Sequence, residues 1–239
     1  SRGNVVAPDS YVEKYGADTV RAYLMFIGPW DAGGPWNFTG IEGVKRFLER
    51  VWTVVTEPGR KADAGDGADG QIRELRHMTH KTLQKVTEDI DAFKWNTAIS
   101  ALMEFNNYLI KARDTAAAGT WAWDEAIDAL LLMMAPAMPH IAEELWQARH
   151  GNGAFKAEES IHVHPWPRYD AELAKADVVT LVVQVNGKVR DRIEAPAGIN
   201  EDQARELALG SPSVQKWFEG KQVRKVIFAG GKLINIVVG

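Results

Sequence analysis

Three side chains stand at a spacing that could do metal chemistry. His140, Glu143 and Glu144 occupy positions i, i+3 and i+4, which would share one face of a helix. However, His140 follows Pro139 at the start of the expected helix, where acidic residues in the first turn interact favourably with the helix dipole. We therefore expect a structural role for the three residues, and no metal site.

Two more histidines, His162 and His164, alternate on a segment that we expect to be extended. No cysteine or spaced carboxylate completes a metal site with them, so a structural role is expected again. The absence of cysteine also excludes disulfides and a cysteine nucleophile, and it fits a reducing cytoplasm. We assign no catalytic residue.

Basic residues form a stripe on the segment 71–92. At about 100° per residue, one arc of this helix is apolar, and the other holds Arg73, Arg76, His77, His80 and Lys81. A basic arc could contact RNA phosphates. A charged arc opposite an apolar one is also typical of a solvated helix surface, and periodicity alone favours that alternative.

The segment 180–193 is predicted to be a β-hairpin around Asn186-Gly187. A plain two-residue turn would place Lys188 opposite Val185 and Arg190 opposite Val183, and would mix apolar and basic residues on both faces. We therefore predict a three-residue loop that ends in Gly187 at positive φ. This register would separate an apolar face (Leu181, Val183, Val189, Ile193) from a polar one (Thr180, Gln184, Lys188, Arg190, Arg192).

The predicted polar face of the hairpin presents three cations in a row, Lys188, Arg190 and Arg192. Such a row suits a phosphate backbone. Further cations that could extend it are Arg224, Lys225 and Lys232.

Charge is segregated along the chain. The 239 residues are 46% hydrophobic and 25% charged, as in ordinary globular proteins, and the net charge is −4. Residues 178–239 hold 9 Lys and Arg against 6 Asp and Glu, whereas the rest of the chain holds 19 against 26. Only the C-terminal part is therefore suited by its overall charge to a polyanion. No apolar run approaches the roughly 18 residues that cross a membrane, and we expect no membrane contact.

The first 176 residues are predicted to be mainly α. Two short helices are expected over 9–28, with Gly16 between them and Asp18 capping the second, and another over 41–56. A solvated connection at 58–70 precedes helices over 71–92, 94–114 and 124–149, the last interrupted at Pro136 and Pro139. Asn106 is expected to be buried and hydrogen-bonded to a neighbouring helix.

The chain changes character at Val178. The first hairpin is followed by a helix that Asn200 and Gln203 would cap, and by a second helix that opens at Ser211-Pro212 and contains Trp217. A second hairpin is expected over 223–238 around Gly230-Gly231. The predicted fold is a helical bundle followed by a small α+β (ββαββ) domain, with domains at 1–40, 41–176 and 177–239.

Several separated stretches resemble leucyl-tRNA synthetase. They are SRGNVV at 1–6, YGADTVR at 15–21, GIEG at 40–43, RFLERVW at 46–52, VTEDI at 86–90, NTAI at 96–99 and PHIAEELW at 139–146. Isoleucyl, valyl and methionyl relatives share most of these. The C-terminal tail distinguishes the leucyl enzyme from these relatives. Its stretches VQVNGKVRD at 183–191, RKVI at 224–227 and GKLINIV at 231–237 are similar to the C-terminal domain of bacterial leucyl enzymes.

The resemblance implies the C-terminal, tRNA-binding part of a class I synthetase. Ser1 would be the remnant of the Lys-Met-Ser-Lys-Ser loop that binds ATP, and residues 1–40 would include the stem-contact helices. The bundle would lie toward the anticodon stem, and the tail would reach the outer corner of leucine tRNA. We expect no cofactor in this piece, whereas the full-length enzyme would use ATP and Mg²⁺.

The resemblance further implies a cytoplasmic and usually monomeric enzyme, of which this piece would be inactive. The alternative is a free-standing RNA-binding or scaffold module descended from a synthetase.

Overall fold

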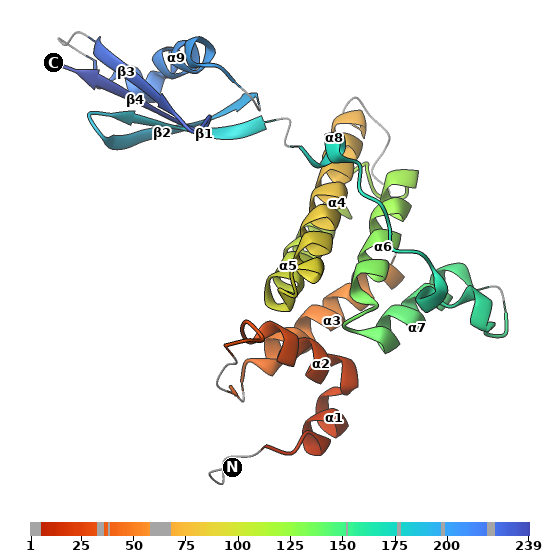
Figure 1. Ribbon diagram of the computed structural model, residues 1–239. Helices are drawn as coiled ribbons and strands as arrows, with labels where there is room; N and C mark the ends of the chain where they lie inside the picture. The colour runs from red at the N-terminus through yellow and green to blue at the C-terminus, as the bar shows by residue number, and fades with distance from the viewer. Residues whose placement is uncertain are drawn as a thin grey trace. The chain divides into compact units, whose positions relative to one another are not determined.

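The computed structural model describes residues 6–32, 36–37, 39–57, 68–151, 153–175, 178–196, 199–218 and 223–239. The chain divides into two compact units, Ser1–Ala174 and Lys175–Gly239 (Figure 1). The first is helical, and the second is a four-stranded sheet with helices, so the predicted fold class is confirmed. Ser1 and residues 58–67 of the predicted solvated connection lie outside the described residues.

Seven helices of 7 to 24 residues form most of the described part of the first unit, and the predicted segments are confirmed in order. They are α1 Asp9–Tyr15, α2 Ala17–Phe26, α3 Ile41–Thr56, α4 Ala68–Asp91, α5 Trp95–Ala112, α6 Trp121–Met134 and α7 Pro139–His150. Gly16 separates the first two at φ 85°, where a side chain would be strained. Two 3₁₀ turns, η1 Ala157–Glu159 and η2 Ile161–Val163, and the short helix α8 Ala171–Ala174 complete the unit.

The core of the first unit extends from α2 and α3 through α4, α5 and α6 to α7, and α4 packs against both α5 and α6 (Figure 1). Its largest fully buried side chains include Phe47, Phe105 and Leu130. Asn106 is also fully buried, but neither amide atom has a hydrogen-bond partner within the described residues. The prediction that Asn106 bonds to a neighbouring helix is therefore wrong, because its face of α5 packs into apolar side chains.

Asp18 joins α2 to α7, and the prediction that it caps its own helix is wrong. Because α2 begins at Ala17, Asp18 lies within the first turn, and its carboxylate reaches the other helix. It accepts hydrogen bonds from the Ile141 amide at 2.7 Å and from His140 Nδ1 at 2.8 Å. Met138, at the N-cap of α7, makes no side-chain cap. Asp18 thus provides that cap from a distant part of the sequence.

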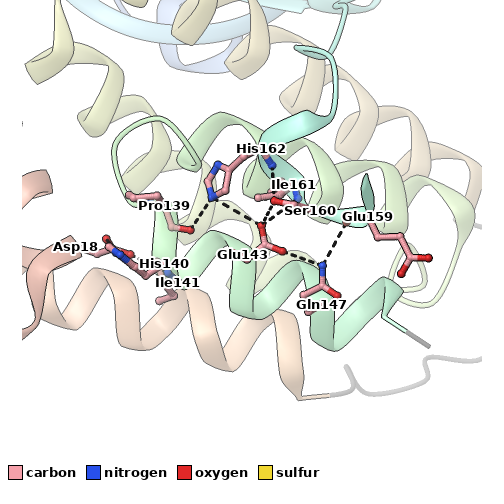
Figure 2. A network of polar contacts seen from close by, with 10 residues as sticks. All are labelled: Asp18, Pro139, His140, Ile141, Glu143, Gln147, Glu159, Ser160, Ile161 and His162. Carbon is pink, nitrogen blue, oxygen red and sulfur yellow. Dashed lines mark hydrogen bonds and ion pairs between the residues drawn. The ribbon is translucent and has the colours of Figure 1, made fainter. Parts of the chain in front are cut away.

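Glu143 fastens the following segment to α7 (Figure 2). One carboxylate oxygen accepts from Ser160 Oγ at 2.6 Å and from the Ile161 amide at 3.1 Å, and the other accepts from Gln147 Nε2 at 2.8 Å. His162 Nε2 lies 3.2 Å from the Pro139 carbonyl, so it donates there. Glu143 therefore points away from His140, and no group of three His, Cys, Asp or Glu in the described chain is arranged to hold a metal ion.

The second unit is a mixed sheet with the strand order β2-β1-β4-β3. Its elements are β1 Val178–Val185, β2 Lys188–Pro196, α9 Glu201–Gly210, α10 Pro212–Gln215, β3 Val223–Ala229 and β4 Leu233–Val238. The two hairpins meet through β1 and β4, which run parallel. The Asn200–Gln203 capping box is confirmed, whereas α10 ends before Trp217. Helix α9 packs against β2, β3 and β4.

The predicted register of the first hairpin is wrong. Asn186-Gly187 forms a plain two-residue turn, with φ of 50° and 78°, and Val185 pairs with Lys188. The alternation is then corrected by a β-bulge, since Val183 pairs with Asp191 and Arg190 is the extra residue. The bulge keeps Leu181, Val183 and Ile193 on one face, but Val189, which was predicted to share that face, pairs with Gln184 and is exposed.

The hydrogen bonds made at the turn explain why residue 186 is an asparagine. The Asn186 amide pairs with the backbone of Val238 in both directions, with Nδ2 donating to the carbonyl at 3.1 Å and Oδ1 accepting from the amide at 3.0 Å. The backbone amide of Asn186 donates to Ile236 at 3.0 Å. The turn is thereby tied to the end of β4.

We predict that Asn186→Gly lowers the free energy of unfolding of the second unit by about 1–2 kcal/mol. Glycine retains the positive φ, so the loss isolates the two amide hydrogen bonds to Val238. Hydrogen exchange of the Val238 amide, measured by NMR, should accelerate with the loss of stability. Unchanged exchange of that amide would show that the side-chain pairing contributes nothing.

Candidate RNA-binding surfaces

The basic arc of α4 is largely used inside the protein. Arg76 Nε donates to Glu125 of α6 at 3.0 Å, and its guanidinium lies 4.8 Å from the Trp121 ring centroid. His80 is buried, and its Nε2 lies 3.3 Å from the same carboxylate. The expectation of a solvated basic face is therefore wrong for this part of α4.

The segment that follows α7 covers the rest of that arc. His80 Nδ1 accepts the Asp170 amide at 3.0 Å, and His77 Nδ1 lies 2.8 Å from the Leu173 carbonyl, to which it can only donate. Arg73 and Lys81 remain exposed and form no ion pair with any described residue. These two cations are the part of the predicted stripe that the fold leaves available to a phosphate.

A phenol on the neighbouring helix stays neutral. Burial, together with the negative charge of Glu74 on α4, raises the pKa of Tyr108 to about 12. At physiological pH the hydroxyl therefore adds no negative charge to this surface.

The sheet separates the three cations of the predicted row. Arg192 pairs with Val182, which places it on the face opposite the buried Leu181 and Val183. Lys188 pairs with the buried Val185, so it lies on the other face, exposed at the end of the hairpin. Arg190 is the extra residue of the bulge and has no partner on β1, so the alternation of the strand does not place it on either face.

Arg190 is held against an aromatic ring. Its guanidinium carbon lies 3.3 Å from the ring centroid of Trp217, and its buried Nε has no hydrogen-bond partner within the described residues. Next to it, Asp191 accepts from Ser211 Oγ at 2.5 Å. Both contacts fasten the bulge to the segment around α10, so packing occupies a side chain that was predicted to face solvent. The partner residue lies 27 positions away, and no sequence signal links the two.

The remaining tail cations are exposed but dispersed. Lys225 pairs with Val237, which puts it on the same open face as Arg192, although on the opposite edge strand. Arg224 is a second bulge residue and lies next to Gly239, whereas Lys232 stands in the turn before β4. The open face of the sheet thus carries Arg192 and Lys225 on its two outer strands.

The described chain is a helical bundle and a small mixed sheet with exposed cations. Residues 73–205 match the family described as the anticodon-binding domain of tRNA ligase, and the chain belongs to this family. No helix among the described residues is long and apolar enough to cross a membrane.

The relatives point to one group within the family. The chain is 48% identical over 238 residues to the leucine–tRNA ligase of Dehalococcoides mccartyi (strain 195) and 49% identical over 239 residues to that of Rubrobacter xylanophilus. Each match covers 100% of this chain and 28% of the relative, so the chain spans less than a third of these enzymes. The resemblance to leucyl-tRNA synthetase is therefore confirmed.

A solved structure has the same fold over the whole chain. It is the ternary complex of Agrobacterium radiobacter K84 agnB2 LeuRS with tRNA and LeuAMS, with a TM-score of 0.78 and 28% sequence identity. The match covers 100% of this chain and 31% of that one.

Proposed function

We propose that this chain is the tRNA-binding C-terminal portion of a leucine–tRNA ligase, and that it positions leucine tRNA for ATP-dependent leucylation elsewhere in the enzyme. The observation that carries the proposal is the fold match over the entire chain to a synthetase whose complex includes tRNA. The alternative of a free-standing RNA-binding or scaffold module is not favoured, because the matches to leucine–tRNA ligases extend over both units.

Catalysis belongs, in this proposal, to the part of those enzymes that the chain does not cover. The proposed site of ATP and Mg²⁺ lies there. Leucine-dependent exchange between ATP and pyrophosphate by the isolated 239-residue chain would contradict this division of roles.

The proposed contacts on this chain are electrostatic. Arg73 and Lys81 on α4 and the exposed cations of the second unit would neutralise phosphates. The candidates on the second unit are Lys188, Arg192, Arg224, Lys225 and Lys232. Arg76, His77, His80 and Arg190, which make internal contacts, would act by supporting the surface.

We predict that the chain binds a leucine tRNA transcript, and that the logarithm of the binding constant K falls linearly with the logarithm of the salt concentration. The slope should correspond to a few phosphate contacts, at roughly 0.9 per contact. Fluorescence titrations at several salt concentrations, with a non-cognate tRNA in parallel, would measure it. Binding of neither tRNA at about 50 mM salt would refute the proposed function.

A further inference from the structure

The turn between α4 and α5 has a phenylalanine where a glycine is usual. The Lys94 amide donates to the Asp89 carbonyl, and the Phe93 amide donates to the Ile90 carbonyl at 2.9 Å. This pair of bonds is the Schellman motif that ends many helices, and its left-handed position is usually occupied by glycine. Here Phe93 adopts φ 57°. Apart from Asn186, it is the one non-glycine residue with positive φ in the described parts of the chain.

The strained side chain is not placed there for burial. Phe93 is 58% exposed, and its ring meets that of Trp30, itself 52% exposed, edge to face with centroids 5.4 Å apart. Trp95 lies behind Phe93 at 6.3 Å. Glycine would form the same turn without strain. Because both rings are largely exposed, their packing on each other offsets little of the conformational strain at Phe93.

These rings line a cleft with polar groups on its rim. The cavity has a volume of about 670 Å³ and is bordered by Pro29, Asp31, Ala92, Lys94, Asn96 and Thr97 as well as the two rings. Lys94 is exposed and precedes α5. The first backbone amides of a helix lack intrahelical partners, and the Lys94 side chain does not cap those of α5. The cleft therefore combines aromatic surface, amide and carboxylate hydrogen-bonding groups, and positive charge.

From this combination we infer that the cleft is a nucleotide-binding site for tRNA, in which the base of an unstacked or helix-terminal nucleotide packs on Trp30 and Phe93. Asn96 and Asp31 face the hydrogen-bonding edge of the base, and Lys94 with the start of α5 holds the adjacent phosphate. A purely apolar peptide would use the rings but not the cation. This inference rests on the proposed tRNA-binding function and adds a contact that its phosphate contacts do not include.

The test separates stacking from charge by their salt dependence. Trp30→Leu and Phe93→Leu keep apolar bulk and remove the aromatic face. Each should weaken binding of leucine tRNA by roughly 5- to 100-fold, with no change in the slope of log K against log salt. Phe93→Tyr should bind as the wild type does. Lys94→Ala should flatten the slope by about one unit.

A glycine variant separates the ligand role from a structural one. Phe93→Gly relieves the positive φ, so its thermal midpoint should not fall, yet it should lose tRNA affinity as Phe93→Leu does. Phe155→Ala, which removes a side chain 60% exposed elsewhere in the same unit, is the matched control and should leave both quantities unchanged.

The outcomes are distinguishable from failure of the proposed function. If the wild-type chain binds tRNA with the expected salt slope but the Trp30 and Phe93 variants bind equally well, the site is refuted and the function stands. If Phe93→Gly melts well below the wild type, the ring is structural and the inference is overturned.

Discussion

Replacing Asp18 with alanine should lower the free energy of unfolding of the first unit by about 2–3 kcal/mol, the largest loss of stability expected from any one polar contact described above. Asp18 is only 7% exposed, and its carboxylate accepts one bond from the Ile141 amide and one from His140. A charge-assisted bond is worth roughly 1.5–3 kcal/mol, and loss of a helix cap costs roughly 0.5–2 kcal/mol. The two estimates describe one carboxylate, so they are not added.

Two variants divide this effect between the partners of Asp18. The His140 side chain is 75% exposed, so His140→Ala should cost under about 1 kcal/mol because water competes for this hydrogen bond. Asp18→Asn keeps one acceptor for the Ile141 amide and should fall between the two. Urea unfolding followed by circular dichroism at 222 nm would rank them. Equal losses for Asp18→Ala and His140→Ala would mean that the helix cap contributes nothing.

Local patterns predicted the helices well because the signals that define them are local. The apolar spacing of 41–56, the prolines at 136 and 139, and the capping box at Asn200 each depend on residues a few positions apart. Their predicted segments agree with the structure within a few residues.

The contacts of polar side chains could not be predicted in the same way, because their partners are distant in sequence. Asp18 accepts a hydrogen bond from the Ile141 amide of α7, which lies 123 positions away in the sequence. His80 accepts a hydrogen bond from the Asp170 amide, which lies 90 positions away. The basic arc of α4 has the composition of a solvated face, yet Glu125 and the segment 170–173 occupy it. Only a tertiary structure distinguishes a cation that contacts solvent from one that contacts a half-buried carboxylate.

The predicted register of β1 and β2 was wrong for a related reason. A hairpin can restore its apolar alternation by a longer turn or by a bulge further along the strand. Both keep Leu181, Val183 and Ile193 on one face, but only the longer turn would add Val189 to it. The choice depends on long-range contacts, since the Asn186 amide pairs with Val238 and the Arg190 bulge packs on Trp217. This difference changes which cations are candidates for RNA binding.

The resulting prediction is that Arg192 and Lys225 bind phosphates, whereas Arg190 does not. The double replacement Arg192→Ala with Lys225→Ala should flatten the slope of log K against log salt by roughly 2 units. At about 100 mM salt, affinity for tRNA should fall by roughly tenfold or more. Both side chains are exposed on the open face, so the stability of the second unit should not change.

Arg190→Ala is the control, because it removes one positive charge from β2, the strand that also carries Arg192. It should leave the salt slope nearly unchanged and destabilise the second unit by about 1 kcal/mol, through loss of the cation–π contact with Trp217. Since phosphate contacts do not distinguish base sequence, the double variant should lose affinity equally for leucine tRNA and for a non-cognate tRNA. If Arg190→Ala flattens the slope while the double variant keeps it, RNA reaches the helix-covered side of the sheet, and the open face is not the binding surface.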